Sequence, residues 1–160
     1  MVLQLKCLVA FLLFHGVLLA LETWDDNSLF LIRSTASNLV LDSRESKVTI
    51  QHFDGYKPQL WKFKRGDRPG LFIIVNNNTG TVLDVDKSNQ NTIILAKEND
   101  SLNQQWILNS NGRIINAGMK LTVDIIHARY VPGNPVIVRT DNGNAAQDFI
   151  VKEKITCGLP

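Results

Sequence analysis

Three hydrogen-bonding side chains accompany two short apolar runs in the middle of the chain: Asp84 lies near the end of the first run, and Asn103 and Gln104 come after the second. The runs, Thr81 to Val85 and Thr92 to Ala96, are rich in β-branched residues, and each leads into a polar loop, so they are predicted to be strands. We expect the three side chains to meet at one end of a sheet. A carboxylate accepts hydrogen bonds while an amide both donates and accepts them, which suits neighbouring hydroxyls of a small polyhydroxylated ligand.

This stretch has copies on both sides. Residues Ser28 to Asp42 align without a gap to Gly70 to Asp84, and a looser third copy runs from Asn111 to Asp124. Each copy holds an apolar run, a polar turn and a second apolar run that ends in Asp. This is the pattern of a β-hairpin.

A second motif repeats after each hairpin. The segments Gln59-Leu60-Trp61, Gln104-Gln105-Trp106 and Gln147-Asp148-Phe149 begin 45 and 43 residues apart. A predicted strand precedes each of them, namely Val48 to Gln51, Thr92 to Ala96 and Val136 to Arg139. No segment shows an apolar pattern at helical spacing, and turn signals recur along the chain. The sequence therefore predicts an all-β domain of three similar units.

The three Q-x-W-like segments, in register with three hairpins that end in Asp, resemble those of the ricin B-type lectin family. The resemblance covers about Leu29 to Lys154 and implies a β-trefoil. We expect one domain over residues 28–155, with repeats of about 40–45 residues at roughly 28–69, 70–110 and 111–155. No other domain is expected.

The family resemblance implies a shallow sugar pocket in each repeat, built from the Asp, an aromatic ring on the next strand and an Asn-Gln pair. The middle repeat keeps Asp84, Asn103 and Gln104, with Ala96 at the ring position. The outer repeats keep only the aspartate and the glutamine, which are Asp42 with Gln59 and Asp124 with Gln147. Their ring and asparagine positions hold Gln51 and Pro58 in the first repeat, and Arg139 and Ala146 in the third. No repeat has the complete set.

A structural interpretation of the same residues stays open. Each Asp can bond nearby backbone N–H groups, and each glutamine can hold the turns of the fold together. The large rings Trp61, Trp106 and Phe149 are predicted to fill the core. Nearby aromatic residues can also replace the missing rings, among them Tyr56 in the first repeat and Tyr130 in the third.

Residues 1–20 have the pattern of a secretory signal peptide. A single early lysine, Lys6, precedes an apolar run of about 15 residues, shorter than the roughly 20 that span a bilayer, and acidic residues follow at once. The alternative is an uncleaved anchor. We expect a secreted, extracellular protein with no membrane insertion. Removing Lys6 from the 17 basic side chains leaves 16 against 15 acidic ones, a balance that gives no drive toward nucleic acid.

Three further residues carry predictions tied to secretion. Cys157 stands alone after the signal peptide, so it either stays a free thiol or joins two chains as a homodimer. Asn77 and Asn99 each begin an N-x-Ser/Thr sequon and are predicted glycosylation sites, which assumes a eukaryotic source.

The sequence contains few residues that could support catalysis. Only His52 and His127 remain after the signal peptide, and no metal-ligand cluster, activated serine or phosphate-binding loop is present. One Asp per repeat leaves no pair of carboxylates for acid-base chemistry. We predict no enzymatic activity, no cofactor and no metal.

The predicted function is weak binding of glycans or glycoproteins, mainly through the middle repeat. The alternative is a trefoil that has lost sugar binding and acts as a protein-binding factor, such as a protease inhibitor or a receptor ligand. Its active surface would be the loop from Asp124 to Pro135, which carries the interface-prone residues Arg129 and Tyr130.

Overall fold

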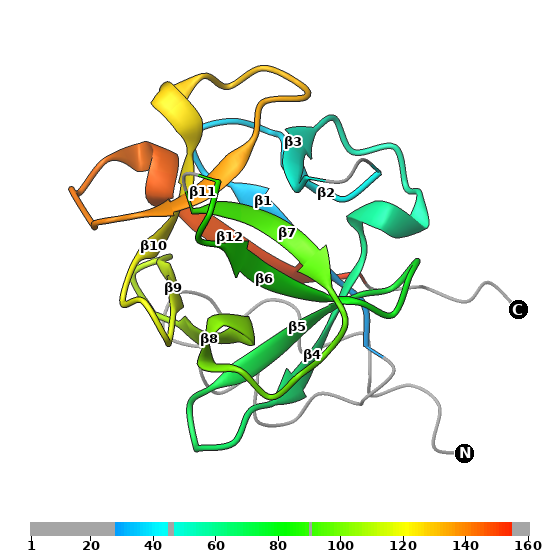
Figure 1. The fold of residues 1–160 in the computed structure, drawn as a ribbon. Coiled ribbons are helices and arrows are strands. Elements are labelled where there is room, and N and C mark those ends of the chain that lie inside the picture. Colours follow the sequence, from blue (N-terminus) through cyan, green and yellow to red (C-terminus); the bar gives the residue numbers. More distant parts are fainter. Residues whose placement is uncertain (1–27, 45–46, 90, 155–160) are drawn as a thin grey trace, which may run out of the picture.

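The computed structural model describes residues 28–44, 47–89 and 91–154, which form twelve β-strands and four short 3-10 turns (Figure 1). The first repeat holds β1 (Phe30–Ser34), β2 (Val40–Asp42), β3 (Thr49–Gln51) and β4 (Trp61–Arg65). The second holds β5 (Phe72–Asn76), β6 (Val82–Asp86), β7 (Thr92–Ala96) and β8 (Gln105–Leu108). The third holds β9 (Ile114–Asn116), β10 (Thr122–Ile125), β11 (Val136–Arg139) and β12 (Phe149–Glu153). The 3-10 turns are η1 (Lys57–Gln59), η2 (Leu102–Gln104), η3 (Ile126–Ala128) and η4 (Ala145–Gln147).

Six strands form a barrel, to which each repeat contributes its first and last strand. Antiparallel ladders join β12 to β1, β1 to β4, β4 to β5, β5 to β8 and β8 to β9. The circle closes where the N–H of Phe149 donates to the carbonyl of Gly112 at 2.9 Å.

The other six strands form three hairpins that cap one end of the barrel, namely β2–β3, β6–β7 and β10–β11 (Figure 1). Single antiparallel bridges connect these hairpins to one another, for example Ile137 with Thr92 and Lys47 with Ile94. This threefold arrangement is a β-trefoil, so the predicted fold is confirmed.

The core rings hold the hairpins onto the barrel. Trp61 and Trp106 are fully buried, and their indole N–H groups donate to the carbonyls of Leu41 and Leu83, at 3.4 and 3.2 Å. Each of these carbonyls belongs to the residue just before the hairpin aspartate. Phe149, which has no such donor, occupies the same place in the third repeat and is 3% exposed. The prediction that these rings fill the core is confirmed, and the two tryptophans fix the backbone that carries Asp42 and Asp84.

Within the described residues, the structure contains no helix of the length and apolarity needed to cross a bilayer. The predicted signal peptide and Cys157 lie outside those residues, so secretion and the homodimer through Cys157 stay predictions.

Candidate ligand site in the middle repeat

A buried glutamine ties each hairpin aspartate to the loop beyond the next strand. In the middle repeat, Gln104 Nε2 donates to Asp84 Oδ2 at 2.8 Å and to the carbonyl of Lys97 at 3.0 Å. Its Oε1 accepts the N–H of Asn99 at 2.9 Å. The same three bonds recur for Gln59 and Gln147.

These three glutamines are at most 1% exposed. Because their amide groups are buried and bonded within the chain, we assign Gln59, Gln104 and Gln147 to holding the carboxylates rather than to touching a ligand. The sequence predicted that these glutamines contact a sugar, with a role in holding the turns of the fold as the alternative. Their buried, internally bonded amides agree better with the alternative. Ligand binding at the aspartates themselves stays a prediction.

The three equivalent carboxylates differ in exposure. Asp42 and Asp124 are buried at 1% and 3% exposed, whereas Asp84 is half-buried. Asp84 Oδ1 accepts the N–H of Val85 at 2.6 Å, and its Oδ2 accepts Gln104. A carboxylate oxygen can accept two hydrogen bonds, so each oxygen of Asp84 keeps capacity for a ligand hydroxyl. Asp84 is the carboxylate best placed to bind one.

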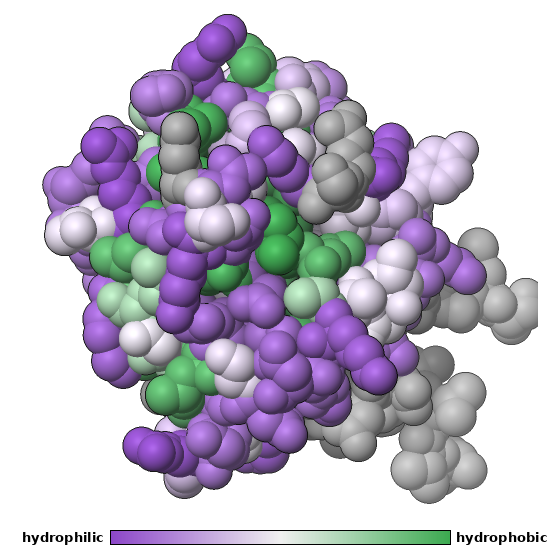
Figure 2. Space-filling model, viewed as in Figure 1, coloured by the Kyte–Doolittle hydropathy of each residue, from purple (hydrophilic) through white to green (hydrophobic). Residues whose placement is uncertain are grey.

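An isoleucine stands beside Asp84 on the neighbouring strand. Asp84 pairs with Ile94 across the β6–β7 ladder, and both side chains are half-buried on the same face of the hairpin. Figure 2 shows hydrophobic residues near the middle of this face of the molecule, with hydrophilic residues around them. The cross-strand neighbour of Asp84 is therefore apolar.

The positions where sequence reasoning expected an aromatic ring lie two residues further along their strands. Gln51, Ala96 and Arg139 pair with Val40, Val82 and Thr122. The partners of the three aspartates are instead Thr49, Ile94 and Ile137. The hairpin register could have identified these partners from the sequence. Pairing the two apolar runs across the polar loop 87–91 puts Ile94 opposite Asp84.

Asn103 lies on η2, which packs against β6, the strand that carries Asp84. Its side chain is half-buried, and its backbone is held from two sides. Its N–H donates to Ser101 Oγ at 3.2 Å, and its carbonyl accepts Asn116 Nδ2 at 2.7 Å. A Cβ at Gly118 would come within 2.7 Å of Asn103 Oδ1, so the absence of a side chain there leaves room for this amide.

The family model described as the ricin-type beta-trefoil lectin domain matches residues 26–153. The chain belongs to this family. Comparison with curated protein sequences gives no match.

Solved structures with the same fold include designed and natural proteins. The designed threefold-symmetric protein ThreeFoil is 20% identical with a TM-score of 0.70, over 77% of this chain and 96% of that one. The C-terminal half of an earthworm R-type lectin, solved with GalNAc, is 20% identical with a TM-score of 0.64, over 79% of this chain and 99% of its own. A mosquitocidal holotoxin is 21% identical with a TM-score of 0.74, over 82% of this chain but only 18% of the toxin.

In this ricin-type domain the first repeat's carboxylate is covered by an arginine. Arg44 Nε donates to Asp42 Oδ2 at 2.9 Å, and the Arg44 N–H donates to Oδ1 at 2.8 Å. The guanidinium also pairs with Asp54 and lies 5.8 Å from the centre of the Tyr56 ring. Gln59 adds a further bond to Oδ2, and the Asp42 carboxylate is 1% exposed, so it is less open to a ligand than Asp84.

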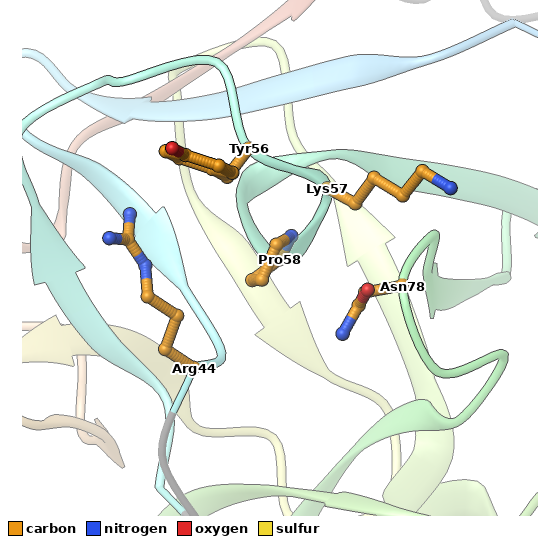
Figure 3. Close-up of a pocket in the computed structure, with 5 residues that line it drawn as sticks. All are labelled: Arg44, Tyr56, Lys57, Pro58 and Asn78. Atoms are coloured by element: carbon orange, nitrogen blue, oxygen red, sulfur yellow. The ribbon is translucent and has the colours of Figure 1, made fainter.

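What remains open in the first repeat is a shallow pocket beside Asp42. It has a volume of about 470 Å³ and is lined by Arg44, Tyr56, Lys57, Pro58 and Asn78. Figure 3 shows Arg44 and Tyr56 on one side of it and Asn78 on the other. The charge of Arg44 is already met by two carboxylates, so Lys57 is the lining residue that could attract an anion to this pocket.

Tyr130 lies near the third repeat's carboxylate. It is half-buried and packs against the core, and Asp124 and Asp148 are close enough to act on its phenol. Burial first, and then these two negative charges, raise the pKa of Tyr130 above its usual 10.0. Tyr130 therefore packs on the domain instead of standing free as an interface anchor, while Arg129 next to it is exposed.

Changing Asp124 to Asn is expected to lower the pKa of Tyr130 toward, but not down to, its usual value. The substitution removes one nearby negative charge and keeps an acceptor for Gln147, while burial of the ring persists. The measurement is the absorbance of the phenolate during alkaline titration. A Tyr56→Phe background leaves Tyr130 as the one tyrosine of the chain, so the signal reports on Tyr130. Asp67→Asn, in the exposed β4–β5 loop, is the control and should change nothing.

The same shift makes stability fall at high pH. A pKa raised by folding means that the contribution is complete below the unfolded value and is lost as the pH rises through the folded value. The titration and the unfolding free energy should therefore change together above about pH 10.

The other predicted positions lie in loops. Asn99 is exposed in the loop held by Gln104, and Asn77 is half-buried after β5, so glycosylation at either one stays a prediction. His52 and His127 are both exposed. Among the described residues, no three His, Cys, Asp or Glu side chains gather to hold a metal ion.

Proposed function

We propose that this ricin-type domain is a secreted, non-enzymatic carbohydrate-binding protein whose main site is the middle repeat. The observation that carries the proposal is the exposure of Asp84, in contrast to the burial of Asp42 and Asp124. Membership of a lectin family supports it, as does an earthworm relative solved with GalNAc. Glycans or glycoproteins are the partners.

Each residue of the site has a separate task in this proposal. Asp84 accepts hydrogen bonds from two neighbouring sugar hydroxyls, and Gln104 keeps the carboxylate turned outward. Asn103 supplies a donor and an acceptor at the rim. Ile94 offers an apolar surface for the C–H face of the sugar, in the place where family members are expected to use a ring.

Such a site binds weakly. With one half-buried carboxylate and no aromatic ring, we expect a dissociation constant on the order of millimolar, or about 4 kcal/mol. Useful binding then depends on clustered glycans or on several copies of the domain, because linked sites raise the effective concentration.

The test is a glycan array probed with clustered multimers of the chain. Asp84→Asn is expected to abolish specific capture, because it removes the charge that two hydroxyls would share while keeping the acceptor for Gln104. Asp67→Asn removes the same charge from the β4–β5 loop and should keep full capture. The double variant Asp84→Ala, Asn103→Ala should be silent. Capture that survives it would disprove the assigned site.

One observation favours the second function, protein binding through the loop after β10. His127 and Ala128 have positive φ angles of 55° and 51°, an unusual backbone for residues other than glycine. Asn134 fixes this shape by donating to the carbonyls of Ile126 and Arg129, both at 2.9 Å. A folded multimer that is silent on glycans, but binds a protein partner in a way that Arg129→Ala abolishes, would establish this function instead.

A further inference from the structure

The third repeat lacks a ring that the other two repeats share. Phe30 and Phe72 stand opposite Trp61 and Trp106 in the barrel ladders, twelve residues before Asp42 and Asp84. The same place in the third repeat, opposite Phe149 and twelve residues before Asp124, is held by Gly112. Both the register and the spacing therefore show that Gly112 occupies the position equivalent to the two phenylalanines.

In the first two repeats these rings pack around a third phenylalanine. Phe30 and Phe72 are 6% and 9% exposed, and both meet Phe63 edge-on, with ring centres 5.1 and 6.5 Å apart. Phe63 lies two residues after Trp61. The residues two after Trp106 and Phe149 are Leu108 and Val151. The third repeat thus has smaller side chains at both ring positions.

The missing volume is left as a pocket where the barrel closes. The pocket has a volume of about 460 Å³, and its apolar lining comes from Leu108, Ile114, Phe149, Ile150 and Val151, with Gly112 beside them. Gly112 has a φ of +89°, and an added Cβ would come within 3.3 Å of the Phe149 carbonyl. A side chain at this position would be strained, so the chain itself does not fill the space from here.

The charged groups of the pocket are already paired. Arg113 lines it and is 7% exposed. Its Nε donates to Asp141 Oδ1 at 3.2 Å, and its Nη1 is bonded to Asp148. With two carboxylates on one guanidinium, the pocket offers no net attraction to an anion. The remaining polar lining is neutral and comes from Thr35, Asn109, Ser110 and Asn111.

We propose that this pocket binds a neutral small molecule that carries one aromatic ring and a hydroxyl or an N–H group. The ring occupies the space that Phe30 and Phe72 fill in the other repeats, and the polar group lies at the Asn109 and Asn111 rim. A pocket of this size, largely apolar with a few polar groups at its edge, is typical of small-ligand sites. The pocket is separate from Asp84, so it does not depend on the sugar site.

The test is a titration of the ¹⁵N-labelled chain with indole and with phenol, followed by amide chemical shifts. We expect saturable shifts at Gly112 and Val151 and none at Asp84 or Asn103. Benzoate, an anion with the same ring, should bind at least tenfold more weakly because Asp141 and Asp148 outnumber Arg113. Asp84→Asn should leave indole binding unchanged, which separates this site from the proposed sugar site.

A variant that fills the pocket can be designed from the first repeat, which has Phe63 where the third repeat has Val151. Val151→Phe places a phenylalanine at this position, and the added ring should weaken indole binding at least tenfold. Val131→Phe makes the same change in an exposed loop and should have no effect. Should Val151→Phe lose its native amide spectrum, Leu108→Phe fills the pocket from the neighbouring strand. An absence of saturable shifts at Gly112, or binding that persists in a folded filling variant, would overturn the proposal.

Discussion

Replacing Gln147 by leucine is expected to cost the domain about 3–5 kcal/mol of unfolding free energy. Gln147 is fully buried, and its Nε2 donates to Asp124 Oδ2 at 2.8 Å. Leucine has a similar size but donates nothing, so it leaves a carboxylate that is 3% exposed without this partner. The carbonyl of Thr140 and the N–H of Asn142 lose their bonds to the same side chain.

The matched control is Gln104→Leu in the middle repeat, which breaks the same three bonds. Asp84 is half-buried, so water can replace the lost donor, and a smaller loss of about 1–2 kcal/mol is expected. Urea unfolding, followed by tryptophan fluorescence, measures both losses, provided that the slope with denaturant is unchanged. Equal losses in the two variants would contradict the view that burial of the carboxylate sets the cost.

A second change tests the same interaction from the other side. Adding Asp124→Leu to Gln147→Leu removes the stranded carboxylate, so part of the lost stability should return. Recovery is expected to be incomplete, because Thr140 and Asn142 still lack their bonds. If the double variant is less stable than Gln147→Leu alone, the carboxylate is not the main source of the loss.

The fold could be predicted because its signal is repeated. Each copy of the hairpin has the same alternation, and the strands expected at Thr92 to Ala96 and Val136 to Arg139 have these bounds in the structure. Three copies of one pattern constrain the architecture more than any single copy, since all three must bury their apolar faces against one barrel. The Q-x-W rings were likewise predictable, because large rings at repeated strand positions fill the interior.

The chemistry of each site was harder to predict, because it depends on residues that do not repeat. Asp42, Asp84 and Asp124 hold equivalent positions on β2, β6 and β10, yet only Asp84 is half-buried. Arg44 bonds Asp42 and also contacts Asp54 and Tyr56. The contacts with Asp54 and Tyr56 depend on how the loop folds back, which the local sequence does not predict. The pairing of Asp84 with Ile94 required the hairpin register. Sequence repetition thus predicts where the candidate sites lie, and local packing sets how exposed each carboxylate is.

Comparison of the repeats also predicts the cost of changing a large core residue. Changing Trp106 to Ala is expected to cost about 3–5 kcal/mol, because it leaves a cavity at a fully buried position. It also removes the indole N–H that bonds the Leu83 carbonyl at 3.2 Å, next to Asp84. The glycan binding proposed for the middle repeat should therefore be lost together with stability.

Trp106→Phe is the matched change, because Phe149 shows that a phenyl ring fits the equivalent position of the third repeat. The phenyl ring keeps most of the packing and loses only the bond to Leu83, so we expect a cost of about 1–2 kcal/mol. Thermal unfolding by calorimetry compares the two variants. If Trp106→Phe is as damaging as Trp106→Ala, the indole hydrogen bond rather than the ring volume dominates, and the third repeat must hold its hairpin backbone by other contacts.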